Sequence, residues 1–207
     1  MSEPKAVARE LDEIVPGLFH YQVHDERIKM ESDAFVLKEK EGAVLIDPLP
    51  LDKTALARLG RISAILLGTP SHQRSAWRFR RELKAEVYAP AGASGLEEKP
   101  DVGYKDGDRL PGGLRAVHAP GPTTDHYAFY LDREPGVLLC SDLLIHEGGK
   151  GVQFLPETYQ EDPARGRQSA RRLLLLKFDV LGFGHGEPIK NGGRAAIEKL
   201  VGETPKH

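Results

Sequence analysis

The 207-residue chain has a single cysteine, Cys140, which excludes an internal disulfide and a zinc site built from thiolates. Because Cys140 ends the apolar run 137–140, we expect it to be a small buried residue. No apolar run approaches the roughly 20 residues that cross a bilayer, and the segment from Met1 to Glu13 lacks the apolar core of a signal peptide. A formal net charge of −2 gives no electrostatic reason to expect nucleic acid as a partner. We therefore expect a cytoplasmic protein that binds neither nucleic acid nor membrane.

Apolar runs separated by turn residues divide the chain into strands and four helices. Asp52 and Asp162 are typical N-cap residues, Pro163 suits the first helical position, and Gly60 suits a helix end. Helices are expected at 53–59, 75–84, 163–176 and 192–202, and strands at 15–21, 33–37, 42–46, 62–67, 87–89, 114–118, 128–131, 137–140 and 180–183. In each half, strands are followed by a helix, which predicts an α+β protein built as a four-layer αββα sandwich. No linker interrupts residues 1–207, which we interpret as one domain.

The most informative segment is the loop from Ile65 to Arg74. A continuous apolar strand, consistent with burial on both faces, ends there in a polar turn, and a helix begins near Ser75. The turn contains one histidine, His72, and one arginine, Arg74. Two further arginines follow Arg74 on the same helical side, at positions 78 and 81, and for these two we expect a solvated face.

Five motifs in this chain resemble landmarks of the metallo-β-lactamase superfamily, in the family's order and at suitable separations. They are the strand 43–47, which ends in an aspartate, the loop 65–74, the turn 119–123, the segment 138–144 and the turn 184–188. The family's versions of the last four read T-H-x-H-x-D-H, P-G-H-T, G-D-L-L and G-H-G. The resemblance extends from about Val15 to Leu200 and implies the family's αββα fold. It also implies metal-assisted hydrolysis, in which one or two zinc ions activate water.

The first zinc of the family is held by the two histidines of H-x-H and by the histidine of P-G-H-T. The resemblance places Thr69, Ser71 and Pro122 at these three positions. Proline has no donor atom, and neutral hydroxyls are poor zinc ligands. The first metal site is therefore expected to be lost.

The second zinc of the family is held by the Asp-His pair, a bridging aspartate and the histidine of G-H-G. Gln73 and Arg74 replace the pair, whereas Asp142 and His185 keep the other two positions. Two ligands are too few for tight zinc binding. If His72 turned inward, it would complete a two-His, one-carboxylate set with Asp142 and His185, suited to one Zn, Fe(II) or Mn ion. If His72 faced solvent or capped the following helix, no such set would form.

Arg74 offers a second interpretation of the same loop. Its guanidinium could reach Asp142 and replace the charge of the metal, because a buried carboxylate is costly without a partner. In the functional version of this interpretation, Arg74 and Arg78 bind a small anion through bidentate contacts, beside Thr69, Ser71 and Gln73.

The turn Pro122–His126 also departs from the family pattern. Asp125 and His126 either supply a ligand or a general base at the pocket mouth, or they are turn and surface residues, which their types favour. The remaining histidines have no partner at ligand spacing, and we expect surface or packing roles for His20, His24, His118 and His146.

A bacterial branch of the family gives a closer resemblance. That branch has the pattern L-T-N-x-D-H-x-R-S-A, an I-D-P-L turn and a helix with S-x-R-R-L. This chain has L-G-T-P-S-H-Q-R-S-A at 67–76, I-D-P-L at 46–49 and S-A-R-R-L at 169–173. The resemblance makes His72 and Arg74 features of the branch, although the branch's loop aspartate is Ser71 here.

From the sequence we expect a hydrolase-family protein with a degenerate site that holds one divalent metal or none. Asp142 and His185 are the expected catalytic residues, with Asp142 orienting the attacking water. The bond cleaved would be an ester, a thioester, a lactone or a phosphoester. The competing hypotheses are an inactive protein that binds a small anion near Arg74, and an interaction module with a filled pocket. The substrate and the oligomeric state stay open, and a homodimer is one option.

Overall fold

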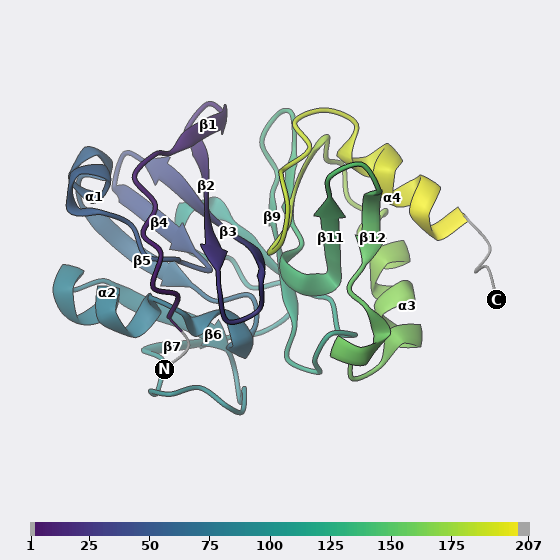
Figure 1. Ribbon diagram of the computed structural model, residues 1–207, viewed down its shortest axis with the longest axis horizontal. Helices are drawn as coiled ribbons and strands as arrows, with labels where there is room; N and C mark the ends of the chain where they lie inside the picture. Colours follow the sequence, from purple (N-terminus) through teal and green to yellow (C-terminus); the bar gives the residue numbers. More distant parts are fainter. Residues whose placement is uncertain (1–2, 203–207) are drawn as a thin grey trace.

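The computed structural model describes residues 3–202, whose two larger sheets lie between pairs of helices (Figure 1). The first sheet has seven strands in sequence order: β1 (Asp12–Val15), β2 (Leu18–Asp25), β3 (Met30–Glu39), β4 (Gly42–Ile46), β5 (Ile62–Leu66), β6 (Glu86–Pro90) and β7 (Val102–Tyr104). Neighbours from β1 to β4 are antiparallel, and neighbours from β4 to β7 are parallel. The helices α1 (Lys53–Leu59) and α2 (Ala76–Leu83) provide two of the crossovers that parallel strands need.

The second sheet has four strands in the order β13-β10-β9-β8. Their bounds are β8 (Arg115–His118), β9 (Tyr127–Leu131), β10 (Val137–Leu139) and β13 (Val180–Gly182). The parallel pair β10 and β13 is connected through a separate hairpin, β11 (Leu144–Glu147) with β12 (Gly151–Phe154), and through α3 (Pro163–Leu173). The last helix is α4 (Gly193–Gly202), and four 3-10 turns lie at Pro70–Gln73, Pro111–Gly113, Ser141–Leu143 and Glu157–Tyr159.

Three apolar clusters separate the four layers. The central cluster joins the two sheets, with Phe35 and Leu66 from the first and Phe129 from the second. One outer cluster packs α1 and α2 on the first sheet, and the other packs α3 and α4 on the second. The predicted αββα sandwich is therefore confirmed, and Figure 1 shows the helix pairs on opposite sides of the sheets.

Local signals set several element boundaries as predicted. Asp52 caps α1 by accepting a hydrogen bond from the Ala55 amide, and Asp162 caps α3 in the same way. Gly60 ends α1 in a backbone conformation with φ of 74°, which an L-residue seldom adopts. Cys140 is fully buried, as its apolar surroundings predicted.

Two expected elements differ in the structure, and one hairpin was missed. The strand predicted at 15–21 begins only at Leu18, because the preceding proline and glycine form the turn of a hairpin with β1. The helix predicted to reach residue 176 ends at Leu173, and Leu175 beyond it is 84% exposed. The hairpin β11–β12 was not predicted at all.

The candidate site lies where parallel strands end. Asp47 follows β4, the loop from Gly68 to Arg74 follows β5, and Asp142 and His185 follow β10 and β13. The carboxyl ends of strands in the two sheets therefore meet at one edge of the sandwich. Among the described residues, no helix is long and apolar enough to cross a membrane.

Candidate metal centre

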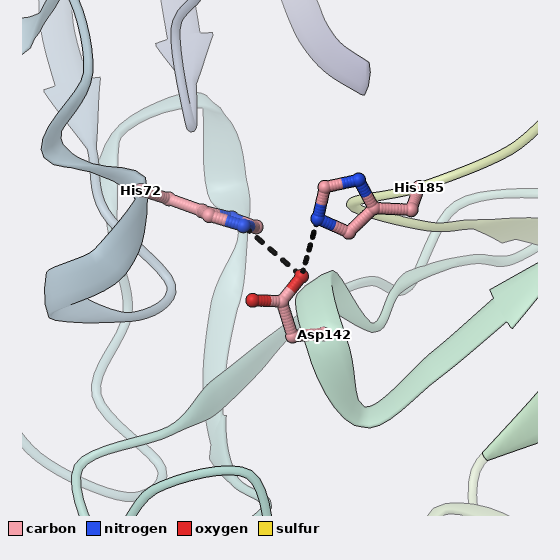
Figure 2. Close-up of side chains that lie close together, drawn as sticks. All are labelled: His72, Asp142 and His185. Atoms are coloured by element: carbon pink, nitrogen blue, oxygen red, sulfur yellow. Dashed lines mark ion pairs between the residues drawn. The ribbon is translucent and has the colours of Figure 1, made fainter. Parts of the chain in front are cut away.

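His72, Asp142 and His185 converge on one point between the sheets (Figure 2). The Oδ1 atom of Asp142 lies 3.0 Å from Nε2 of His72 and 3.4 Å from Nε2 of His185. His72 is 2% exposed and His185 is 8% exposed, so the group is enclosed on most sides. His72 therefore turns inward, and it forms with Asp142 and His185 the set that was expected for that orientation.

Hydrogen bonds to the far side of each ring fix the tautomers of the two histidines. The Nδ1 atom of His185 lies 2.7 Å from the carbonyl oxygen of Glu31, which can only accept, so Nδ1 carries the proton. On His72, Nδ1 lies 3.0 Å from Oδ2 of Asp47 and 3.0 Å from the hydroxyl of Ser141. Because that hydroxyl donates to the same Oδ2 atom, the Nδ1 proton of His72 is directed to Asp47. Both Nε2 atoms are thereby left as lone-pair donors that face Asp142.

Asp47 holds the loop that carries His72. Its Oδ1 atom accepts a hydrogen bond of 2.7 Å from the Gly68 amide, and its Oδ2 atom faces His72 and Ser141. A carboxylate on the far nitrogen of a metal-binding histidine is the usual support of such a ligand. Asp47 therefore acts through His72 and does not itself face the pocket.

His126 holds Asp142 from behind. It is fully buried, its Nδ1 atom donates to the Ala119 carbonyl, and its Nε2 atom accepts from the backbone amide of Asp142. Burial lowers its pKa to about 4, so the ring stays neutral near neutral pH. The expectation of a surface role for His126 is wrong, because the ring, directly before β9, is buried against Ala119 and Asp142.

A buried pair fixes the loop that carries His185. Asp33 on β3 accepts from Nε2 of His20 at 2.6 Å and from the Gly186 amide at 2.6 Å, and its own amide donates to the Gly184 carbonyl. A methyl group on Gly184 would lie 2.6 Å from both Oδ1 of Asp142 and Cε1 of His72, so only glycine allows this approach. His20 has the packing role that was expected for it.

The charges in the centre favour the ligand forms of Asp142 and His185. Burial would raise the pKa of Asp142, but His72, His185 and Arg74 outweigh it and lower that pKa well below its usual range. Burial lowers the pKa of His185. Burial and Arg74 also lower the pKa of His72, yet Asp142 and Asp47 outweigh them and raise it. As the pH falls, protonation of His72 would therefore compete with metal binding.

The three donor atoms fit one divalent metal ion. Nε2 of His72 and Oδ1 of Asp142 are fully enclosed and form an ion-pair contact of 3.0 Å with each other, but neither has a hydrogen-bond partner. Ligands about 2.1 Å from a tetrahedral zinc are about 3.4 Å from one another, and the three donor atoms here all lie within 4.8 Å of one another. Two histidines and one carboxylate also suit Fe(II) or Mn. A bound metal would therefore account for two buried atoms that have no hydrogen-bond partner.

Arg74 does not take the place predicted by the metal-replacement hypothesis. Within residues 3–202 it forms no ion pair with Asp142, and its Nη1 atom instead donates to the carbonyls of Asp33 and Asp47 at 3.0 and 3.3 Å. Its φ of 24° lies in the left-handed region, which directs the side chain toward β3 and β4. Burial lowers the pKa of Arg74, against the opposing charges of Asp47, Asp142 and Asp33.

The other three predicted ligand-binding residues fall into two groups. Thr69 and Ser71 line the pocket, and their hydroxyls lie 3.2 Å apart. Gln73 points away: its side-chain oxygen accepts from the Trp77 indole and the Glu97 amide, and its nitrogen donates to the Gly95 carbonyl. Gln73 therefore joins α2 to the loop after β6, and it does not line the pocket with Thr69 and Ser71.

A pocket of about 680 Å³ opens in front of the metal centre. It is lined by Ile28 in the turn between β2 and β3, by Met30 at the start of β3, and by Leu155 and Tyr159. Two large apolar side chains at the rim are unusually exposed, Ile28 by 50% and Tyr159 by 72%. The filled pocket of the interaction-module hypothesis is therefore not what the structure has.

Several supporting residues were not assigned these functions from the sequence. The spacing of Asp47, Ser141 and Glu31 along the chain gives no sign that two side chains and a carbonyl meet the ligand histidines. A partial signal existed for Asp47, which follows a buried strand at the position of the family's structural aspartate.

Comparisons with known proteins agree with this architecture. A family model described as metallo-beta-lactamase superfamily matches residues 12–203. A hydroxyacylglutathione hydrolase from Chromohalobacter salexigens is 39% identical over 92 residues, which make up 44% of this chain and 34% of that enzyme. The alignment thus spans about a third of its length.

Solved structures resemble the fold at low identity. A metallo-beta-lactamase from Pontibacter korlensis is similar with a TM-score of 0.74 and 17% identity, over 94% of this chain and 99% of that one. A metallo-beta-lactamase family protein from Thermus thermophilus is similar with a TM-score of 0.68 and 22% identity, over 91% of this chain and 79% of that one.

Proposed function

Because the chain belongs to the metallo-β-lactamase superfamily, we propose that it is a metal-dependent hydrolase whose single metal binds to His72, Asp142 and His185. The observation that carries this proposal is a pair of enclosed atoms without a hydrogen-bond partner, Nε2 of His72 and Oδ1 of Asp142, which lie in contact with one another and beside Nε2 of His185. Such an arrangement leaves lone pairs directed at one point, which a cation satisfies.

A divalent metal held there would supply Lewis acidity for the attack of water on the substrate. The residues of the chain prepare the site for it. Asp47 and Ser141 keep the proton of His72 on Nδ1, and the Glu31 carbonyl does the same for His185. The buried His126 holds the backbone of Asp142, whose carboxylate stays ionised and orients polar groups that enter from the pocket.

The pocket indicates a substrate with an apolar part. Ile28, Met30, Leu155 and Tyr159 form an apolar rim beside the metal centre, and exposed apolar side chains of this kind favour contact with a ligand. The candidate bonds are those of esters, thioesters, lactones and phosphoesters. The partial similarity to hydroxyacylglutathione hydrolase supports the hydrolase class for this chain.

A catalytically inactive, anion-binding protein is the alternative. It is favoured by the loss of the first metal site, since Thr69, Ser71 and Pro122 stand where the family has three histidines and all line the pocket. The two functions differ in whether a metal is bound.

Metal analysis of the purified full-length protein, with anomalous scattering from crystals, tests the proposal. We expect one metal per chain on His72, Asp142 and His185, and loss of both metal and hydrolytic activity in His185→Ala. His118→Ala is the matched control, because that ring contacts the Thr124 carbonyl and Tyr127 outside the centre. A metal-free wild-type protein, or unchanged metal content in His185→Ala, would refute the assignment.

A further inference from the structure

The guanidinium of Arg74 has one edge that nothing in the described chain uses. Its Nη1 atom donates to the carbonyls of Asp33 and Asp47, and these are the side-chain hydrogen bonds of Arg74 within residues 3–202. Nε and Nη2 remain, and they form the edge that binds a carboxylate or phosphate through two parallel hydrogen bonds. Neither nitrogen is among the fully enclosed unpaired atoms of this part of the chain.

The same side chain is buried and lines the pocket. Arg74 is only 7% exposed, and no carboxylate of residues 3–202 forms an ion pair with it. Asp47, Asp142 and Asp33 attract it from a greater distance. A buried cation without a direct partner is costly, so the chain retains this arrangement against a cost in stability.

A second unpartnered group lines the same pocket. The Ser32 hydroxyl is fully enclosed in the protein without a hydrogen-bond partner. Ser32 precedes Asp33, whose carbonyl accepts from Arg74, so both groups are fixed to the same part of β3. An enclosed hydroxyl without a partner is costly, and an oxyanion bound beside it would give it an acceptor.

We propose that Arg74 and Ser32 form a subsite for an oxyanion group of the substrate, a carboxylate or a phosphate, beside the metal centre. The substrate would then carry an anionic group bound by Arg74, an apolar part against Ile28 and Tyr159, and the scissile bond at the metal. The inference rests on the proposed function in treating this pocket as the substrate site. It gives Arg74 a role next to a metal, not in place of one.

The structural alternative is that Arg74 only connects the strands β3 and β4. Only Nη1 donates to the carbonyls of Asp33 and Asp47, and the ammonium group of a lysine at this position could donate to them in a similar way. The alternative therefore predicts that Arg74→Lys keeps every property of the protein, whereas the subsite needs the planar fork.

Calorimetric titration of the purified full-length protein with inorganic phosphate, and separately with acetate, tests the inference. We expect saturable binding of at least one of these anions, and the stronger one identifies the substrate group. Arg74→Lys should weaken it about tenfold, the equivalent of one charge-assisted hydrogen bond, and Ser32→Ala should weaken it less. Arg78→Lys is the matched control, because Arg78 lies on the next turn, pairs with Glu3 and Glu82, and does not line the pocket.

Anion binding in the His185→Ala variant, which should lack the metal, separates this inference from the proposed function. Anion binding that depends on Arg74 but survives in His185→Ala supports the subsite, even if the metal assignment fails. Binding that is lost in His185→Ala and unchanged in folded Arg74→Lys would mean that the metal alone holds the anion, and it would overturn the inference. Absence of binding of either anion to the folded wild-type protein at millimolar concentrations would overturn it as well.

Discussion

The neutral state of His126 makes the stability of this protein depend on pH. Its ring donates from Nδ1 to the Ala119 carbonyl and accepts at Nε2 from the Asp142 amide, so a second proton has no acceptor and would break the bond to Asp142. Burial lowers the pKa of His126 from 6.5 to about 4. In the unfolded chain the same ring takes up a proton below its ordinary pKa, so the unfolded state binds more protons in this window.

The sign and size of the effect follow from the two pKa values. Above about pH 6.5 the ring is neutral in both states and does not affect the free energy of unfolding. As the pH falls toward 4, stability is lost, to a limit of about 3 kcal/mol at 1.36 kcal/mol per pKa unit. Between pH 8 and pH 5 the loss from His126 alone is about 2 kcal/mol.

Urea unfolding at pH 8 and pH 5, with a chelator present, measures this loss. Other groups titrate in the same window, so the comparison is with His126→Gln, which keeps a donor and an acceptor but does not titrate. We expect the wild-type protein to lose about 2 kcal/mol more than the variant between the two pH values. An equal loss in both proteins would show that His126 is not held neutral, and the account of its burial would be wrong.

Two substitutions test how the loops around the centre are built. Gly184→Ala should abolish metal binding while the fold persists, because the added methyl group would lie 2.6 Å from Asp142 Oδ1 and His72 Cε1. Gly148→Ala is the control, because its methyl group meets nothing within 4 Å. The metal content of the two purified variants tests the prediction. Gln73→Ala should leave metal content and anion binding unchanged but lower the free energy of unfolding by about 1–3 kcal/mol, because an indole and a backbone amide lose their shared acceptor. A change in anion affinity in Gln73→Ala would contradict the conclusion that Gln73 does not line the pocket.

The fold followed from the sequence because its signals are local. The helix 53–59 begins after the Asp52 cap and ends at Gly60 as predicted, and β4 has the predicted bounds. The missed hairpin β11–β12 has a weaker pattern, since its second strand is only partly buried. Its turn contains Gly148 and Gly149, a signal that turn chemistry alone could have revealed.

The side-chain directions in the site did not follow from the sequence. His126 lies in a polar turn pattern, yet it directly precedes β9, which is buried at every position, and its own ring is fully buried. Asp47 and His72 are 25 residues apart and meet only because β4 and β5 are neighbours in the sheet. Periodicity predicts which face an element buries, but it does not predict which polar groups of two loops will meet.

The structure separates the two interpretations of the loop: His72 turns inward, as a metal site needs, whereas Arg74 does not pair with Asp142, as metal replacement required. His72 has φ of −95° and ψ of 17°, in the bridge region where many active-site residues lie, and Arg74 has φ of 24°. These two conformations turn His72 toward Asp142 and Arg74 toward the carbonyls of β3 and β4.

Strain in the backbone is concentrated around this site. Of the five non-glycine residues with positive φ in the described chain, three are Asp47, Arg74 and Ser141, which surround the ring of His72 or follow it. Each such conformation costs on the order of 1–3 kcal/mol and persists only where the surroundings impose it. A chain that had merely lost its metal ligands would have no reason to keep three strained residues here, so the strain favours a site that is retained for binding.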